Sequence, residues 1–207
     1  MTSDIREFSC EKLAAGRIIL FVKKILLLIF PLCLLYGCGT SNEIQYVLAN
    51  DSYRCEEFDI TKEKMLRLIN RARESSRNCG YKIFTPAGQV TWNPTLARAA
   101  LSHSVDMATE DFVSHKGSSG KEVSYRVEEV SYSWITVGEN ISAGREDSEE
   151  VVAAWLLSPH HCENIMRQSF TEIGAACFHN KDTKYKTFWT VVFGSPMDEV
   201  KGATPQQ

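Results

Sequence analysis

The stretch SEEVVAAWLLSPHHCENIM, Ser148–Met166, combines a predicted helix with a cluster of reactive side chains. Asp147, immediately before it, and Glu150 have the spacing of a capping box, which marks the start of a helix. Apolar side chains at helical spacing are expected to face the core, namely Val151, Val152, Trp155 and Leu156. Pro159 is predicted to stop this helix, so the two histidines and the cysteine of residues 160–162 are expected on a turn.

Two further helices are predicted upstream of this stretch. Residues 60–78 form the first, which Gly80 follows, because apolar residues recur there at helical spacing: Met65, Leu68, Ile69 and Ala72. Asn93 as N-cap and Pro94 at the first helical position begin the second, which is expected to end near Asp111.

The later part of the chain is rich in predicted strands. VGENISAG (137–144) is expected to be one strand. EIGAACFH (172–179) and YKTFWTVVFG (185–194) are expected to form a hairpin, because the polar turn NKDTK separates them. A shorter helix is expected within residues 123–134. Helices before and between late strands predict an α+β fold with helices packed on a mainly antiparallel sheet.

Composition limits the kind of protein this is. The chain has 207 residues, of which 43% are hydrophobic and 24% charged, and this suits one globular domain with a leader. The formal net charge is −3, and lysines and arginines are scattered along the chain. Nucleic acid is therefore excluded as an expected partner.

The N-terminal residues 1–37 have the pattern of an export signal. Lys23 and Lys24 precede an apolar run over residues 25–36, which is shorter than the roughly 20 residues that a membrane-crossing helix needs. The run ends in LYGC, which resembles a bacterial lipobox, so Cys38 is expected to carry palmitate-type acyl chains that anchor the protein in a membrane. The alternative is an ordinary secretory signal. Both place the protein outside the cytoplasm, in the bacterial cell envelope or secreted.

Three regions are expected after the leader. A polar tether covers residues 38–59, a folded domain covers residues 60–197, and a flexible tail covers residues 198–207. Four cysteines fall after the lipobox, and an even number in an exported chain predicts two disulfides. They are Cys55, Cys79, Cys162 and Cys177. The sequence does not choose among the three pairings, although a predicted helix between them disfavours joining Cys55 to Cys79.

Over residues 65–196 the sequence resembles the CAP superfamily (cysteine-rich secretory proteins, antigen 5, pathogenesis-related 1), in its bacterial branch of SCP-like domains. The stretches that carry the resemblance are MLRLINRARESSRNCG, WNPTLARAALSHSVDMA, FVSHKG, VGENISAG, VVAAWLLSPHHCENIM, FTEIGAAC and FWTVVFGSP. The resemblance implies a three-layer α-β-α sandwich. It also implies a cavity lined by histidine and glutamate, which in many members binds a divalent metal, often zinc.

Three residues match the cavity positions of this family. His115 in FVSH and Glu139 in GEN match positions of the whole superfamily, and His161 matches the histidine that the bacterial branch places after its Ser-Pro-Gly sequence. His160 stands where that branch has glycine, so it is either an added ligand or an exposed bystander. His103 also belongs to the family pattern, but it lies on the apolar face of its predicted helix, which favours a partnered core histidine over a ligand.

The sequence departs from the eukaryotic members at three cavity positions. Ser158 stands where they have a glutamate, and Phe188 stands where they have the strand histidine. Val191 replaces a glutamine that both branches share. The full eukaryotic set of two histidines and two glutamates is therefore absent.

Several chemistries remain for the matched residues. Two imidazoles and one carboxylate with an open fourth position suit Zn²⁺ or another divalent metal, whereas the alternative is a polar network without metal. Cys162 beside His161 raises a Cys/His nucleophile, but an exported cysteine among four is usually oxidised.

The favoured function is an envelope-anchored binding module, without catalytic residues, for a small apolar, lipid-like or sterol-like ligand. One alternative is a metal-dependent hydrolase of peptide or cell-wall material, with Glu139, His115 and His161 as its catalytic residues. The other is a non-catalytic scaffold for an envelope or host protein. The oligomeric state does not follow from the sequence.

Overall fold

A computed structural model of the 207-residue chain describes Cys55 and residues 62–197. The predicted leader, the predicted lipid attachment at Cys38 and the predicted C-terminal tail lie outside the described residues, as does the predicted tether apart from Cys55. None of the helices within the described residues is long and apolar enough to cross a membrane.

A four-stranded sheet forms the middle layer, in the order β3-β5-β6-β4. The outer strands are β3 (Thr91–Trp92) and β4 (Trp134–Ala143), and the inner strands are β5 (Glu172–His179) and β6 (Thr187–Pro196). β3 runs parallel to β5, while β6 pairs antiparallel with both β5 and β4. The prediction of a mainly antiparallel sheet with a late hairpin is confirmed.

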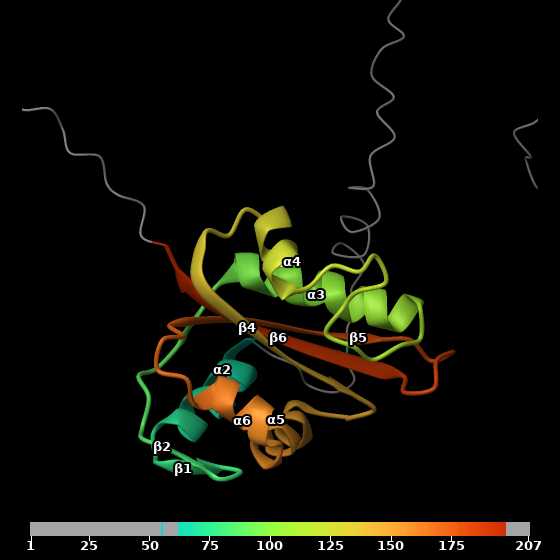
Figure 1. Cartoon of the computed structure of the whole chain (residues 1–207). Helices are drawn as coiled ribbons and strands as arrows, with labels where there is room; N and C mark the ends of the chain where they lie inside the picture. Colours follow the sequence, from blue (N-terminus) through green and yellow to red (C-terminus); the bar gives the residue numbers. More distant parts are fainter. Residues whose placement is uncertain (1–54, 56–61, 198–207) are drawn as a thin grey trace, which may run out of the picture. The chain divides into compact units, whose positions relative to one another are not determined.

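Helices cover both faces of this sheet (Figure 1). One layer contains α3 (Pro94–Thr109) and α4 (Val123–Glu129), and the other contains α2 (Lys62–Arg73), α5 (Ser148–Leu157) and α6 (Pro159–Met166). The predicted α+β fold with three layers is therefore confirmed.

The core lies on both sides of β6, which is buried from Thr187 to Gly194. Toward α2, α5 and α6 its side chains join the largest apolar cluster, which includes Trp155, Trp189 and Phe193. Toward α3 and α4, Val192 and Phe188 join two smaller clusters. A strand buried on both faces fixes the sheet register, because a one-residue slip would turn every side chain to the wrong layer.

The start of α3 agrees with the sequence pattern. The Asn93 side chain accepts hydrogen bonds from the amides of Thr95 and Leu96, and Pro94 occupies the first turn. The helix ends at Thr109, two residues before the predicted end.

The prediction of one helix over residues 60–78 is wrong at its C-terminal end. α2 ends at Arg73, and the next residues form a two-stranded hairpin of β1 (Arg77–Cys79) and β2 (Lys82–Phe84). The Arg73 carbonyl accepts a hydrogen bond from the Ala87 amide instead of continuing the helix. The Arg73 guanidinium is buried and donates to the carbonyl oxygens of Gly88, Ile165, Arg167 and Phe170. Tertiary contacts thus override a favourable helical pattern.

The prediction of a turn after Pro159 is also wrong. α5 does end at Leu157, but Pro159 opens a new helix, α6, which contains both histidines and Cys162. Proline is well suited to the first position of a helix, because its missing N–H would have no partner there. The same residue therefore ends one helix and begins the next.

Two disulfides join the described cysteines. Cys55 pairs with Cys177 and Cys79 pairs with Cys162, with Cα atoms 5.6 Å and 5.4 Å apart. The predicted presence of two disulfides, without a link between Cys55 and Cys79, is confirmed. Cys162 has no free thiol, so the Cys/His nucleophile is set aside.

Candidate functional site

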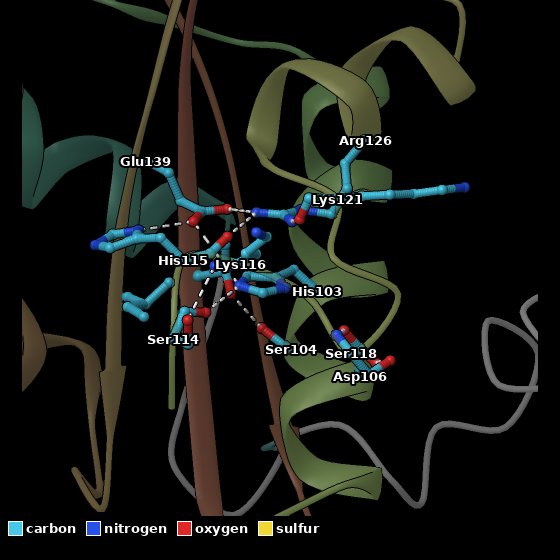
Figure 2. Close-up of polar contacts among 12 residues, drawn as sticks. His103, Ser104, Asp106, Ser114, His115, Lys116, Ser118, Lys121, Arg126 and Glu139 are labelled. Carbon is cyan, nitrogen blue, oxygen red and sulfur yellow. Dashed lines mark hydrogen bonds and ion pairs between the residues drawn. The ribbon is translucent and has the colours of Figure 1, made fainter. Parts of the chain in front are cut away.

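A buried carboxylate lies at the centre of the candidate site. The Glu139 side chain is only 2% exposed, although it belongs to the outer strand β4. Its Oε1 accepts a hydrogen bond from His115 Nδ1 at 2.9 Å, and its Oε2 accepts one from Arg126 Nη2 at 2.6 Å (Figure 2). Both carboxylate oxygens are therefore engaged by neighbouring side chains.

Arg126, which the sequence reasoning missed, holds this arrangement together. Its Nη1 donates to the Lys121 carbonyl at 2.9 Å, and its Nη2 also donates to the His115 carbonyl at 3.1 Å. One guanidinium thus fixes the loop before α4 and the carboxylate on β4. The signal was present in the sequence, since Arg126 shares the inward stripe of α4 with Val123, Val127 and Val130.

His115 presents one ring nitrogen outward. Its side chain is 56% exposed, while its Nδ1 is bonded to Glu139. An ionised carboxylate can only accept, so in the neutral ring Nδ1 carries the proton and Nε2 carries the free lone pair. This carboxylate–histidine arrangement is the one that orients metal-binding imidazoles in proteins.

His161 approaches the same place from the opposite layer. Its ring centroid lies 6.2 Å from that of His115, and the ring is half-buried. Asn140 Nδ2 donates to the His161 carbonyl at 2.9 Å, while Asn164 Nδ2 donates to the Glu139 carbonyl at 3.0 Å. Glu139 and Asn140 point to opposite faces of β4, so the two histidines meet around the outer edge of the sheet.

Electrostatics keep Glu139 ionised. Burial alone would raise its pKa, but the hydrogen bond from His115 and the charge of Arg126 act against burial and, with His103, hold the pKa below its ordinary value. Burial lowers the pKa of His161, and the neighbouring His115 and His160 lower it further. His161 is thus held in the neutral form, which is the form that binds metals.

His103 lies close to Glu139, on the face of α3 that packs into the core. It is fully buried, its Nε2 lies 2.9 Å from the Ser114 carbonyl oxygen, and the same nitrogen is 3.8 Å from Glu139 Oε1. Its Nδ1 has no hydrogen-bond partner among the described residues. Burial is the main cause that lowers the pKa of His103, and Arg126 adds to it. This position suits a neutral packing histidine.

The residues present fit a metal only in part. Within Cys55 and residues 62–197, no group of three or more His, Cys, Asp or Glu side chains is placed to hold a metal ion. Glu139 has both oxygens occupied, whereas the outward Nε2 of His115 and the ring of His161 fit as donors. The donor set is therefore two imidazoles, with Glu139 behind them as the partner that orients His115. His160 is exposed next to this pair.

The three positions that depart from the eukaryotic pattern supply no further donor. Ser158 is the N-cap residue of α6. Phe188 and Val191 are fully buried in β6, where they belong to the apolar core.

A groove lies between α2 and α5, apart from the histidine pair. The volume of this groove is about 330 Å³. Its apolar lining residues are Leu68, Ala72, Val152, Ala153 and Leu156. Arg71, Arg77 and Glu149 add charge at this groove. Arg77 Nε is buried and has no hydrogen-bond partner among the described residues.

Comparison with known proteins identifies the family. The model of the cysteine-rich secretory protein (CAP) family matches residues 66–193, which is more than half of the chain. The chain is 35% identical over 80 residues to the uncharacterized protein YkwD of Bacillus subtilis (strain 168), a match that covers 39% of the chain and 31% of YkwD. It is 28% identical over 99 residues to the uncharacterized membrane protein YlbC of the same organism, with 48% and 28% covered. The matches span less than a third of either relative.

Solved structures show the same fold. An extracellular protein containing an SCP domain from Bacillus anthracis superposes with a TM-score of 0.51 and 24% identity, covering 64% of this chain and 39% of that protein. An outer surface protein of Borrelia burgdorferi superposes with a TM-score of 0.53 and 18% identity, covering 77% and 97%. With its sandwich, its paired cysteines and its matched sequence, the chain belongs to the cysteine-rich secretory protein (CAP) family.

Proposed function

We propose that this protein is an exported, lipid-anchored binding module whose ligand site is the His115–His161 pair at the edge of β4. The observation that carries the proposal is the 2.9 Å bond from His115 Nδ1 to the buried Glu139. It leaves the outward nitrogen of His115 free, opposite His161. The lipid anchor would be attached at Cys38 and would hold the module at the envelope.

Zn²⁺ or another divalent metal is the ligand that this pair favours. Neutral imidazole nitrogens bind such metals well, and a carboxylate behind one imidazole strengthens it as a donor. Two protein donors leave positions for an oxygen or nitrogen group of a second molecule. The pair therefore suits capture of a metal together with a small ligand.

Hydrolysis is less well supported than binding. A general base needs a free lone pair within reach of substrate and a pKa near the working pH. The Glu139 side chain is only 2% exposed, each of its oxygens accepts a side-chain hydrogen bond, and its pKa is held low, so it is a weak base that is shielded from substrate. Its role in this proposal is to orient His115. Recognition of the module by another envelope or host protein would add to this binding role.

Isothermal titration calorimetry of the full chain with Zn²⁺ tests the metal site. We expect His115→Ala and His161→Ala each to weaken binding by about tenfold or more, because each removes one of two donors. His179→Ala, which changes a histidine at the end of β5, is the matched control and should bind like the wild type. Equal zinc affinity of the wild type and all three variants would contradict the proposed site.

A lipid-like ligand would fit the groove between α2 and α5. Its apolar lining suits an acyl chain, and the half-buried guanidinium of Arg77, which lines the groove, suits a carboxylate head group. We propose this groove as a second binding site, separate from the His115–His161 pair, for a lipid-like ligand.

Fluorescent fatty-acid titration tests the groove. Ala153→Glu, which places a charge in the lining, should abolish binding, and Arg77→Met should weaken it several-fold for the acid but not for the matching alcohol. Arg98→Met, an exposed arginine on the other layer, is the control. Identical affinities for acid and alcohol in wild type would rule out the head-group role of Arg77.

A further inference from the structure

The layer of α2, α5 and α6 ends in a group of protruding apolar side chains. Tyr81, Leu157 and Ile83 are the three most exposed large hydrophobic residues of the described chain, at 108%, 87% and 77%. Tyr81 lies in the hairpin turn, Ile83 on β2, and Leu157 at the end of α5. We call these three residues the hairpin patch.

Two contacts fasten the β1–β2 hairpin to the start of α6. The Cys79–Cys162 disulfide joins β1 to α6. Gly80, with φ of +63°, packs so closely on Pro159 that an added Cβ would lie 3.1 Å from the proline ring. Leu157 is two residues before that proline, at the junction of α5 and α6.

The pairing of the hairpin strands explains why Ile83 points away from the domain. Cys79 and Lys82 are register partners and face α6, where Cys79 is buried and Lys82 Nζ bonds Glu163 Oε2 at 2.8 Å. Asn78 and Ile83 are the next pair and must therefore face the opposite side, toward solvent. An isoleucine and a tyrosine at these positions contribute little packing to their own domain.

We propose that the hairpin patch is a lipid-facing surface, which inserts its side chains into the interfacial region of a phospholipid bilayer. The proposal rests on the envelope location proposed above. Protruding side chains on a disulfide-bonded hairpin suit the fluid interface of a bilayer, because lipids can pack around each side chain. A stable protein partner would need a broader complementary surface. The ion pair with Glu163 offsets the charge of Lys82, so we expect insertion to depend on apolar contact more than on anionic lipid.

Cys55 ties the N-terminal part of the chain to the layer that carries the hairpin patch. Cys55 is fastened to Cys177 of β5, and both belong to the apolar cluster under α2, α5 and α6, the layer that carries the patch. Between Cys38 and Cys55 the chain can span at most about 60 Å. A domain held by an anchor at Cys38 would therefore remain within reach of the bilayer.

Hydroxyl-radical labelling of the full chain in phosphatidylcholine vesicles tests the proposal. In water Tyr81 should be labelled faster than Tyr125 of α4, since their exposed fractions are 108% and 46%. Insertion should reverse this order, and the reversal should persist in high salt. On vesicles, the double variant Ile83→Ser/Leu157→Ser should again show faster labelling of Tyr81 than of Tyr125, as in water. Ile135→Ser, which changes an exposed isoleucine on β4, should leave the reversal intact.

Two results would overturn the proposal. One is faster labelling of Tyr81 than of Tyr125 in vesicles. The other is a reversal that disappears when the protein is diluted on the vesicles, because this would mean that a second copy covers the patch. The mass of the N-terminal peptide from the same sample reports acylation at Cys38 separately. An acylated Cys38 with a freely labelled Tyr81 would support the lipid anchor and contradict the insertion. An unmodified Cys38 with a protected Tyr81 would support the insertion and contradict the lipid anchor.

Discussion

Arg126→Met is expected to lower the free energy of unfolding by about 3–5 kcal/mol, because it leaves the carboxylate of Glu139 buried without its cation. The Glu139 side chain is 2% exposed, so water cannot replace the guanidinium at little cost. Methionine preserves most of the packing volume of the arginine stem. Urea unfolding at neutral pH measures the change.

The pH dependence identifies the cause of this loss. Because the pKa of Glu139 is lowered in the folded protein, its stabilising contribution is present above its unfolded pKa and is lost as pH falls through the folded pKa. The difference in free energy of unfolding between wild type and Arg126→Met should therefore shrink in acid. At neutral pH, adding Glu139→Gln to the Arg126→Met variant should recover part of the lost stability. Arg98→Met, an exposed arginine of α3, should cost less than about 0.5 kcal/mol. Similar losses for both arginines would contradict the buried-pair interpretation.

Gly174→Ala is expected to destabilise the domain by about 3 kcal/mol or more, because β5 and the start of α3 touch backbone to backbone at this position. An alanine Cβ would lie 2.0 Å from the Ala97 nitrogen and 2.3 Å from the Leu96 carbonyl carbon. The helix cannot retreat easily, since Asn93 caps it and its side chain also bonds Glu172 on β5.

Gly88→Ala is the matched control for this prediction. No atom lies within 4 Å of the Cβ position at Gly88, so alanine there should be neutral or stabilise by about 0.5 kcal/mol through the unfolded chain. Thermal or urea unfolding of both variants measures the difference. Equal midpoints for the two variants would mean that the close approach of β5 to α3 is not as described.

The sequence predicts most of the layers because their elements have strong local signals. Asn93-Pro94 marks the start of α3, and the polar turn after residue 179 marks the hairpin of β5 and β6. It fails where distant contacts decide the local structure. Arg73 ends α2 through bonds to residues about 90 positions away, and no local pattern records them. Pro159 is compatible with both a helix stop and a helix start, so tertiary structure decides.

The candidate site was found from the sequence only in part. Family motifs point to His115, Glu139 and His161, and the structure brings His115 against both of the others. The motifs do not tell a ligand from its supporting residue, because that distinction depends on how many bonds a side chain already makes. Arg126 occupies the second oxygen of Glu139 and thereby gives Glu139 a supporting role, and it is absent from every motif used.

The measurement that tests the central claim most directly is the ¹⁵N NMR spectrum of the histidine side chains, with and without Zn²⁺. The proposed arrangement predicts that His115 carries its proton on Nδ1 before and after zinc is added, and that zinc shifts Nε2 of His115 together with a ring nitrogen of His161. A proton on Nε2 of His115, or a zinc-dependent shift confined to His160 and other exposed histidines, would contradict the account.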